Sequence, residues 1–210
     1  MTITYRFLDE TDFEKVSQFY VNEFFPREPI GFALKGVSKD AELYADIEIR
    51  PKLSQKNSVG AFNESGELVG MNIMDFELNG NQSFKENEEL PLYYRQFFKL
   101  EEALIDGNLE DCIGTKNYAN CHILGIRSDY AGLGIATELC KKIEVTDKEC
   151  QAVYAVATSY YSQKIMKKFG FKFIKTIAYK DYVDPITGCK IYSNMQSPHE
   201  CVALAVKYLN

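Results

Sequence analysis

The sequence contains no tryptophan, only two histidines and no long apolar run. None of its hydrophobic stretches approaches the roughly 18 residues that a membrane-spanning helix needs, so we expect no membrane partner. The N-terminal segment, MTITYRFLDETDFEK, lacks the apolar centre of a secretory signal peptide. Together these absences predict a protein of the cytoplasm.

The six cysteines form no C-x-x-C pair and no other spacing typical of a metal site, so we expect no bound metal. In a reducing cytoplasm they are expected to be unpaired and mostly buried. Basic residues are not in excess: 24 Lys and Arg against 30 Asp and Glu give a net charge of −6. This balance argues against nucleic acid as a partner, because phosphate neutralisation requires clustered basic side chains.

Large apolar side chains are plentiful, since 46% of the residues are hydrophobic and there are 14 Tyr and 14 Phe. At 210 residues the chain is expected to form a single domain, residues 1–210. Hydrophobic periodicity and turn signals predict its elements. Strands are expected at 3–8, 58–63, 67–76, 118–127, 152–157, 171–179 and 202–208, and helices at 38–56, 92–104, from 135 onward and 162–169.

A further helix is expected near the N-terminus, with Thr11 and Glu14 as its capping box and its end near Pro26. Loops are expected at 24–31 (FFPREPIG, rigid and extended), 79–90 and 183–198. The mixed order predicts an α+β fold with helices on both faces of one sheet. A dinucleotide-binding fold is disfavoured, because its glycine turn would follow the first strand rather than lie past mid-chain.

The most informative segment is LGIRSDYAGLGIAT, residues 124–137. An apolar strand leads into a turn containing Gly132 and Gly134, and an amphipathic helix follows. The first amides of a helix have no intrahelical acceptor, and the helix dipole places partial positive charge there. Such a turn can bind a phosphate group, although an ordinary tight turn has the same pattern.

This segment resembles the acetyl-CoA-binding segment of the GNAT superfamily of N-acetyltransferases. Gly134 and Ala136 match the family pattern, and Ala131 stands where the family usually carries Arg or Gln. The block VYAVATSYYSQKIMKKFGF resembles the next strand–helix segment of that family. FFPREPIGFAL and SPHECVALAVKYL are similar to segments of the insect arylalkylamine N-acetyltransferases. The resemblance implies a GNAT-like fold, with a mixed, mostly antiparallel central sheet and helices on both faces.

The resemblance also implies an activity: transfer of an acetyl group from acetyl-CoA to the primary amine of an arylalkylamine, by direct attack in a ternary complex. Dopamine, serotonin, octopamine and tyramine represent this substrate class. We expect a monomer. The residues implied in cofactor binding are Leu124, Gly125 and Ile126 along the strand, and Leu133, Gly134, Ile135, Ala136 and Thr137 through their amides.

Glu28 lies in the segment that holds a catalytic glutamate in the insect enzymes, so the resemblance implies that it is the base that deprotonates the amine. The alternative to this catalytic role is that Glu28 is a surface residue in an exposed ion pair with Arg27. Many GNAT enzymes place a tyrosine where this chain has Met166, so the general acid must differ. The insect branch points to Ser162 and Thr158, for which helix capping is the alternative. For both histidines, His122 and His199, a structural role is the better interpretation.

Two other functions stay open. An acetyltransferase of the same fold could act on polyamines or agmatine, in a pocket lined by Glu23, Glu28, Asp40 and Glu42. The chain could also be a catalytically silent CoA-binding module, an interpretation favoured by its two departures from the family pattern. Turnover of a panel of amines would separate the three.

Overall fold

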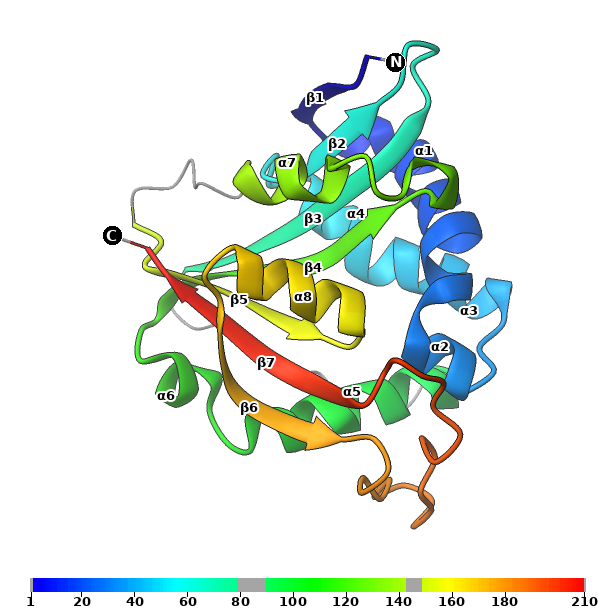
Figure 1. The fold of residues 1–210 in the computed structure, drawn as a ribbon, viewed down its shortest axis with the longest axis vertical. Coiled ribbons are helices and arrows are strands. Elements are labelled where there is room, and N and C mark those ends of the chain that lie inside the picture. The colour runs from blue at the N-terminus through cyan, green and yellow to red at the C-terminus, as the bar shows by residue number, and fades with distance from the viewer. Residues whose placement is uncertain (1, 79–89, 143–148, 210) are drawn as a thin grey trace. The chain divides into compact units, whose positions relative to one another are not determined.

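The computed structural model describes residues 2–78, 90–142 and 149–209, and these form a mixed α+β fold. The strands are hydrogen-bonded in the order β1-β2-β3-β4-β5-β7-β6 (Figure 1). The pairs β1/β2, β2/β3, β5/β7 and β6/β7 are antiparallel, which confirms the predicted, mostly antiparallel sheet. Most of the predicted loop 79–90 lies outside the described residues. The chain divides into two compact units, and its organisation as one domain stays a prediction.

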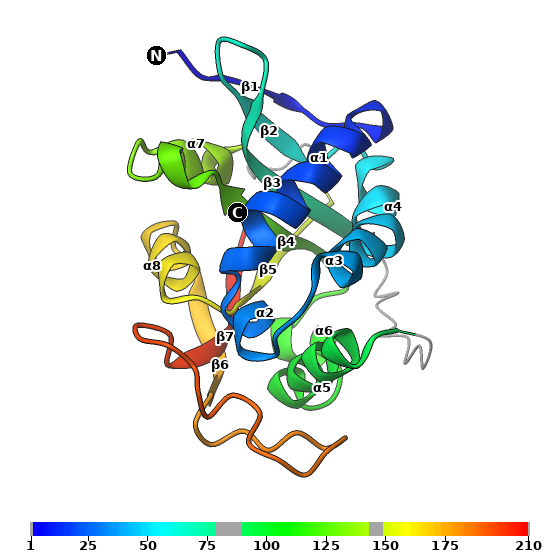
Figure 2. The same ribbon diagram turned by 90° about the vertical axis from the view of Figure 1, so that its right-hand side faces the viewer.

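The first unit comprises Met1–Arg27, Val37–Phe76 and Ala119–Cys150. Figure 2 shows α1 and α7 on opposite sides of its strands. The elements are β1 (Thr4–Phe7), α1 (Phe13–Phe19), α3 (Ser38–Tyr44), α4 (Arg50–Leu53), β2 (Val59–Phe62), most of β3 (Leu68–Leu78), most of β4 (Asn117–Ile126) and α7 (Ile135–Lys141).

Strand β4 shows why helices cover both faces of this unit. Leu124 and Ile126 pack against the buried cluster that contains Ile135 of α7. Gly125, between them, faces the rings of Phe19 and Phe24 instead. Successive residues of a strand point to opposite faces, so this alternation directs one face of β4 to α7 and the other to the N-terminal helix.

The N-terminal helix ends near Pro26, as predicted, but it begins differently from the prediction. Its cap is Asp9, paired with Asp12 in a capping box, and not Thr11 with Glu14. A π-helical turn, Tyr20–Phe24, follows α1, and a 3-10 turn then carries the helix through Pro26 to Arg27. The N–H of Phe25 donates to the Tyr20 carbonyl five residues back. The backbone reaches Pro26, which has no N–H to donate, directly after this widened turn.

A widened, π-helical turn also precedes Pro51. A π-helical turn, Ala45–Ile49, joins α3 to α4, and the Arg50 N–H donates to the Ala45 carbonyl. Pro51 then lies in the first turn of α4, where a missing N–H costs no hydrogen bond. The predicted helix 38–56 is therefore observed through Leu53, without a break at its proline.

The second unit comprises Glu28–Gly36, Glu77–Tyr118 and Gln151–Asn210. Helices α5 and α8 lie on opposite sides of its three strands (Figures 1 and 2). Helix α6 was not predicted. The elements are α2 (Pro29–Ala33), α5 (Leu92–Ile105), α6 (Leu109–Ile113), β5 (Ala152–Ala157), α8 (Tyr160–Lys168), β6 (Lys172–Ala178) and β7 (Cys201–Tyr208).

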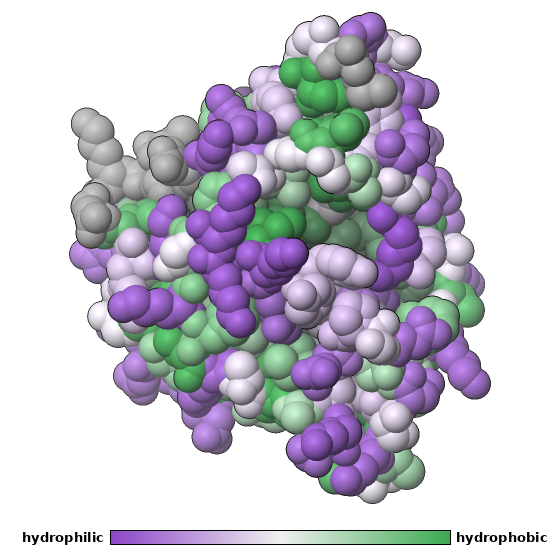
Figure 3. Space-filling model, viewed as in Figure 1, coloured by the Kyte–Doolittle hydropathy of each residue, from purple (hydrophilic) through white to green (hydrophobic). Residues whose placement is uncertain are grey.

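The surface seen in Figure 3 is largely hydrophilic, with smaller apolar areas between the polar side chains. Among the helices of the described residues, none is long and apolar enough to cross a membrane. All six cysteines are free, and three of them are buried: Cys121, Cys140 and Cys150. Cys189 is exposed.

Candidate active site

The predicted glycine turn connects β4 to α7 in the first unit. Between Ile126 and Ile135, Gly132 and Gly134 have φ angles of 79° and 80°, a left-handed conformation that glycine adopts without steric penalty. Gly134 is the N-cap of α7, and its carbonyl accepts from the Glu138 amide at 3.1 Å. The amides that precede Glu138 in the first turn have no carbonyl of their own helix within reach.

Three of the side chains predicted to be core pack together: Ile135 is buried, and Leu124 and Ile126 are half-buried against it. Leu133 is the exception, because its side chain is 58% exposed. What the strand and the turn can offer a ligand is therefore mainly backbone.

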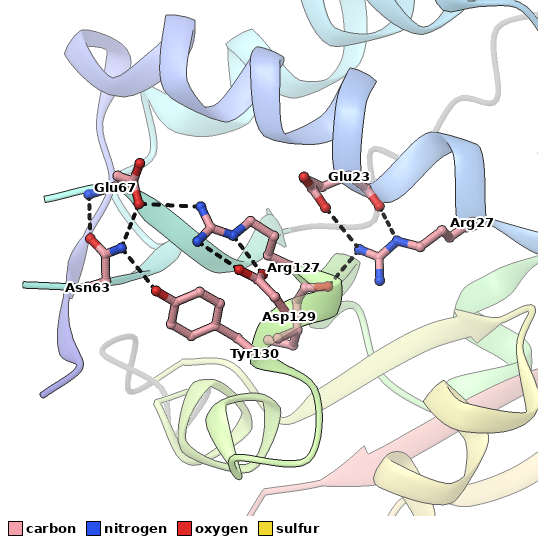
Figure 4. Close-up of polar contacts among 8 residues, drawn as sticks. Glu23, Arg27, Asn63, Glu67, Arg127, Asp129 and Tyr130 are labelled. Carbon is pink, nitrogen blue, oxygen red and sulfur yellow. Dashed lines mark hydrogen bonds and ion pairs between the residues drawn. The ribbon is translucent and has the colours of Figure 1, made fainter. Parts of the chain in front are cut away.

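A polar network fixes the residues that lead into the turn (Figure 4). The buried Tyr130 accepts a hydrogen bond at its hydroxyl from the Asn63 side chain, 3.0 Å away. The Arg127 guanidinium lies 4.7 Å from the centre of the Tyr130 ring and donates to Asp129 at 2.8 Å. Arg127 also lies 3.5 Å from a carboxylate oxygen of Glu67, which in turn pairs with Asn63. The turn is thus anchored to the β2–β3 hairpin.

Arg27 does not pair with Glu28, the alternative that the sequence left open. Its guanidinium donates to the Ile126 carbonyl at 2.7 Å and to the backbone carbonyl of Glu23. The Glu23 carboxylate lies 3.9 Å from the guanidinium (Figure 4). Arg27 therefore ties the end of the N-terminal helix to the end of β4.

Glu28 lies in the second unit, at the N-cap of α2. The segment 24–31 was expected to be an extended loop, and this prediction is wrong: Pro29 begins α2, because proline suits the first helical position. One oxygen of Glu28, Oε2, accepts from the Gly31 amide at 2.6 Å. The other, Oε1, is buried and has no hydrogen-bond partner among the described residues. The cap thus holds one oxygen and leaves the other unpaired.

The surroundings of Glu28 make it more basic than an ordinary carboxylate. Burial raises its pKa, because the charged form loses its hydration. The amides of Gly31 and Ile30 and the hydroxyl of Thr158 oppose this shift, since they favour the charged form, but burial is the larger effect. Such a group can accept a proton near neutral pH more readily than a surface glutamate can.

Thr158 follows β5, and its side chain lies beside the Glu28 carboxylate. Its backbone carbonyl accepts a hydrogen bond from the Tyr179 hydroxyl at 2.6 Å. The sequence offered Glu28 and Thr158 as candidates for different steps and did not predict that they are neighbours.

Ser162 takes part in the start of α8. Ser159 is the N-cap, and its hydroxyl accepts from the Ser162 amide at 3.0 Å. The Ser162 hydroxyl accepts in return from the Ser159 amide at 3.3 Å, which completes a capping box. The helix begins at Tyr160, two residues before the predicted start. Capping by Ser162 is therefore observed, and a catalytic role for it stays a prediction.

Both histidines have partners. His122 is half-buried, and its Nε2 lies 2.9 Å from the Tyr44 hydroxyl. Burial and the nearby Lys52 hold the pKa of His122 well below its usual value, so it is neutral. His199 Nδ1 accepts from the Tyr160 amide at 3.1 Å, so in the neutral ring the proton lies on Nε2. Neither geometry is that of an activated nucleophile pair.

Two tyrosines near Glu28 were not predicted from the sequence. The Glu28 charge contributes to raised pKa values at Tyr179 and Tyr192, after burial, which is the main cause. Tyr179 directly follows β6, and Tyr192 lies in the predicted loop 183–198. A loop tyrosine has no periodicity that would mark it as a neighbour of Glu28, so no sequence signal was available.

Comparison with known proteins finds similarity in structure only. No family model matches the sequence, and no match is found among curated proteins. An arylalkylamine N-acetyltransferase 2 from Aedes aegypti has a TM-score of 0.88 at 24% identity, over 100% of both chains. A Drosophila melanogaster polyamine N-acetyltransferase that forms N-acetylagmatine has a TM-score of 0.79 at 18% identity, over 99% of this chain and 100% of that one. NAA60 from Arabidopsis thaliana in complex with acetyl-CoA has a TM-score of 0.53 at 13% identity, over 99% and 100%.

Proposed function

From the GNAT fold, which this chain shares with those acetyltransferases, we propose that it transfers an acetyl group from acetyl-CoA to the primary amine of an arylalkylamine. The observation that carries this proposal is the Glu28 carboxylate: one oxygen is held by an amide, the other is buried and unpaired, and burial raises its pKa. A carboxylate in this setting suits a general base.

Acetyl-CoA is the proposed donor. In support, the turn at Gly132 and Gly134 presents the first amides of α7 with no side chain of the N-cap over them. We propose that the amides of Leu133 to Thr137 hold the pyrophosphate and that the backbone of Leu124–Ile126 pairs with the pantetheine arm. A bound acetyl-CoA in the Arabidopsis relative agrees with this donor.

The chemistry requires a neutral amine. An alkylamine has a pKa of about 10.4, like lysine, and is protonated at neutral pH. Glu28 takes that proton, directly or through a water molecule, and the freed nitrogen lone pair then attacks the thioester carbonyl carbon. As the new C–N bond forms, the C–S bond breaks. The departing sulfur receives a proton from the Thr158 or the Ser162 hydroxyl, and that hydroxyl takes up in exchange the second proton that the acylated nitrogen loses.

The alternative acceptor, a polyamine, finds less support from the candidate carboxylates. Glu23 lies beside the Arg27 guanidinium. Asp40 accepts a hydrogen bond from the Val37 amide at 3.3 Å and so serves as a cap of α3. Glu42 is exposed. Of the four carboxylates that the sequence offered to a polyamine, Glu28 alone has a buried, unpaired oxygen.

A thiol-release assay with acetyl-CoA and an amine panel tests this proposal. Tyramine and tryptamine should be acetylated with much higher kcat/KM than spermidine or agmatine. A preference for spermidine or agmatine would replace the arylalkylamine by a polyamine. Binding of acetyl-CoA in calorimetry, with no turnover of any amine, would instead establish a silent CoA-binding module.

A further inference from the structure

Two buried tyrosine hydroxyls in the second unit have no hydrogen-bond partner among the residues that the structure describes. They belong to Tyr182 and Tyr192, whose side chains are 6% and 1% exposed. A buried polar group without a partner destabilises the folded state relative to a paired one, because it has lost its hydrogen bonds to water. Folded proteins contain few such groups, and each calls for a reason. Phenylalanine at either position would fill the same space without this cost.

These hydroxyls belong to a cluster of three tyrosines, Tyr179, Tyr182 and Tyr192, and the charge of Glu28 acts on two of them, Tyr179 and Tyr192. The ring centres of Tyr179 and Tyr192 are 5.5 Å apart, and those of Tyr192 and Tyr182 are also 5.5 Å apart. Tyr179 uses its hydroxyl within the protein, as a donor to the Thr158 carbonyl. The other two hydroxyls of the cluster make no hydrogen bond to any residue that the structure describes. The cluster therefore offers unpaired hydroxyls in the same unit as the unpaired oxygen of Glu28.

The segment that carries these tyrosines is held by a buried carboxylate. Asp184, fully buried, accepts from the Gln96 side chain at 2.9 Å and from the Thr187 amide and hydroxyl at 3.0 and 2.6 Å. Its own backbone amide donates to the Cys189 carbonyl at 2.9 Å. These bonds fix the chain between the two tyrosines, so their hydroxyls are positioned before any ligand arrives.

We infer that the Tyr182 and Tyr192 hydroxyls determine acceptor specificity, by hydrogen bonding to a hydroxyl group on the aromatic ring of the amine. This inference rests on the proposed function, because it assumes that the nitrogen of the same molecule is delivered to Glu28. A phenol hydroxyl both donates and accepts, and a ring hydroxyl of the acceptor does the same, so the two groups complement each other.

The electrostatic surroundings support this assignment. Burial, with Asp184 and Glu102 nearby, raises the pKa of Tyr182 to about 12. Burial also raises the pKa of Tyr192, with contributions from Tyr182, Glu28, Asp184 and Glu101. Both hydroxyls therefore keep their protons at neutral pH and can donate. A site that hydrogen-bonds a substrate hydroxyl rejects the analogue that lacks it, because its own polar groups then stay unpaired.

The test compares two amines that differ by one hydroxyl, tyramine and phenethylamine. The measured quantity is the ratio of their kcat/KM values in the wild type, in Tyr192→Phe and in Tyr182→Phe. We expect the wild type to favour tyramine and each variant to lose about tenfold of that preference, the value of one hydrogen bond. Tyr208→Phe is the matched control. Tyr208 is the last residue of β7, and its hydroxyl donates to the Ile113 carbonyl at 2.8 Å. Its ratio should equal that of the wild type.

Stability gives a second readout. Because neither hydroxyl has a partner in the described part of the chain, Tyr192→Phe and Tyr182→Phe should melt at the same temperature as the wild type or higher. Equal ratios in all four proteins, or a marked loss of stability in Tyr192→Phe and Tyr182→Phe, would overturn the inference while leaving the proposed function intact. Selective loss of agmatine rather than tyramine turnover would also overturn it, because the hydroxyls would then accept from a cation. Failure of the wild type to acetylate either amine would refute the proposed function itself.

Discussion

Replacing Glu28 by Gln separates the two roles of Glu28, which are the cap of α2 and the proposed general base. Glutamine keeps a carbonyl oxygen that can accept from the Gly31 amide, as Oε2 does at 2.6 Å. It removes the charge, and its amide nitrogen takes the place of the unpaired Oε1. The substitution therefore leaves the helix cap in place and abolishes proton acceptance.

The sign of the effect on stability follows from the raised pKa. An acid whose pKa is higher in the folded state than its ordinary value of 4.5 binds its proton more tightly when folded. Its stabilising contribution is complete below pH 4.5 and is lost as the pH rises through the folded-state pKa. Above that pH the wild type holds a buried carboxylate with one unpaired oxygen, and Glu28→Gln does not. The variant should therefore gain stability relative to the wild type as the pH rises.

The expected gain above the folded-state pKa is about 1 kcal/mol, the low end of the cost of an unpaired buried group, because the glutamine nitrogen is itself unpaired. In a chain of this size about 1 kcal/mol raises the melting temperature by roughly 2–4 °C. Asp40→Asn is the matched control: Asp40 accepts from the Val37 amide near the start of α3, and its replacement should change melting little at any pH.

Activity should move in the opposite direction. Loss of a general base lowers kcat/KM by about 10²–10⁴-fold. The wild-type kcat/KM should rise with pH as Glu28 loses its proton, and the variant should lack that rise. Thermal melting from pH 4 to 8 and initial rates from pH 6 to 9 provide the two profiles. An unchanged kcat/KM across pH 6 to 9 would refute the assignment of the base, whatever the melting curves show.

Three further experiments test the glycine turn, the packing of β4 and the role of Ser162. Gly134→Ala forces a residue with a Cβ to a φ of 80°, which costs about 1–2 kcal/mol of stability and should raise the KM for acetyl-CoA about tenfold. Gly66→Ala is the control, because Gly66 has a φ of 76° in the β2–β3 turn. It should lose the same stability in denaturant unfolding without a change in that KM. Gly125→Ala places a methyl carbon 2.9 and 3.2 Å from two aromatic rings and should lower stability by about 1–3 kcal/mol in thermal melting. Ser162→Ala and Ser159→Ala should each lose about 1 kcal/mol of stability, because each removes one half of the capping box of α8. A fall in kcat of more than about 100-fold in Ser162→Ala alone would identify Ser162 as a general acid. Equal kcat values in the two variants would leave Ser162 as a helix cap only.

Local patterns predicted the elements whose signal lies in their own residues. Strand β5 has the predicted bounds, 152–157, because a short apolar run between polar residues is sufficient to specify a buried strand. Helix α5 was predicted to within one residue, because its apolar spacing continues over three turns. The glycine turn was predicted because only glycine adopts the φ angles at Gly132 and Gly134 without strain.

What the sequence could not predict depends on contacts between distant residues. Pro51 suggested a possible break in its helix, but the π-helical turn before it lets the helix continue to Leu53. Nothing local distinguishes Glu28 from a surface glutamate, because the groups that act on its carboxylate include the side chain of Thr158, which is far away in the sequence. Tyr182 and Tyr192 had no signal for a similar reason: their loop is held by Asp184, whose partner Gln96 is 88 positions away.

The cap of α2 has a consequence for how position 28 tolerates change. Aspartate, asparagine and serine are the better residues for beginning a helix, so each could satisfy the Gly31 amide at least as well. Each is also shorter, and would withdraw its remaining polar atom from the place that Oε1 occupies. Selection for thermal robustness alone would accept these replacements; only selection for turnover would keep the longer side chain. A deep mutational scan scored separately for abundance and for acetylation should therefore give opposite rankings at this one site.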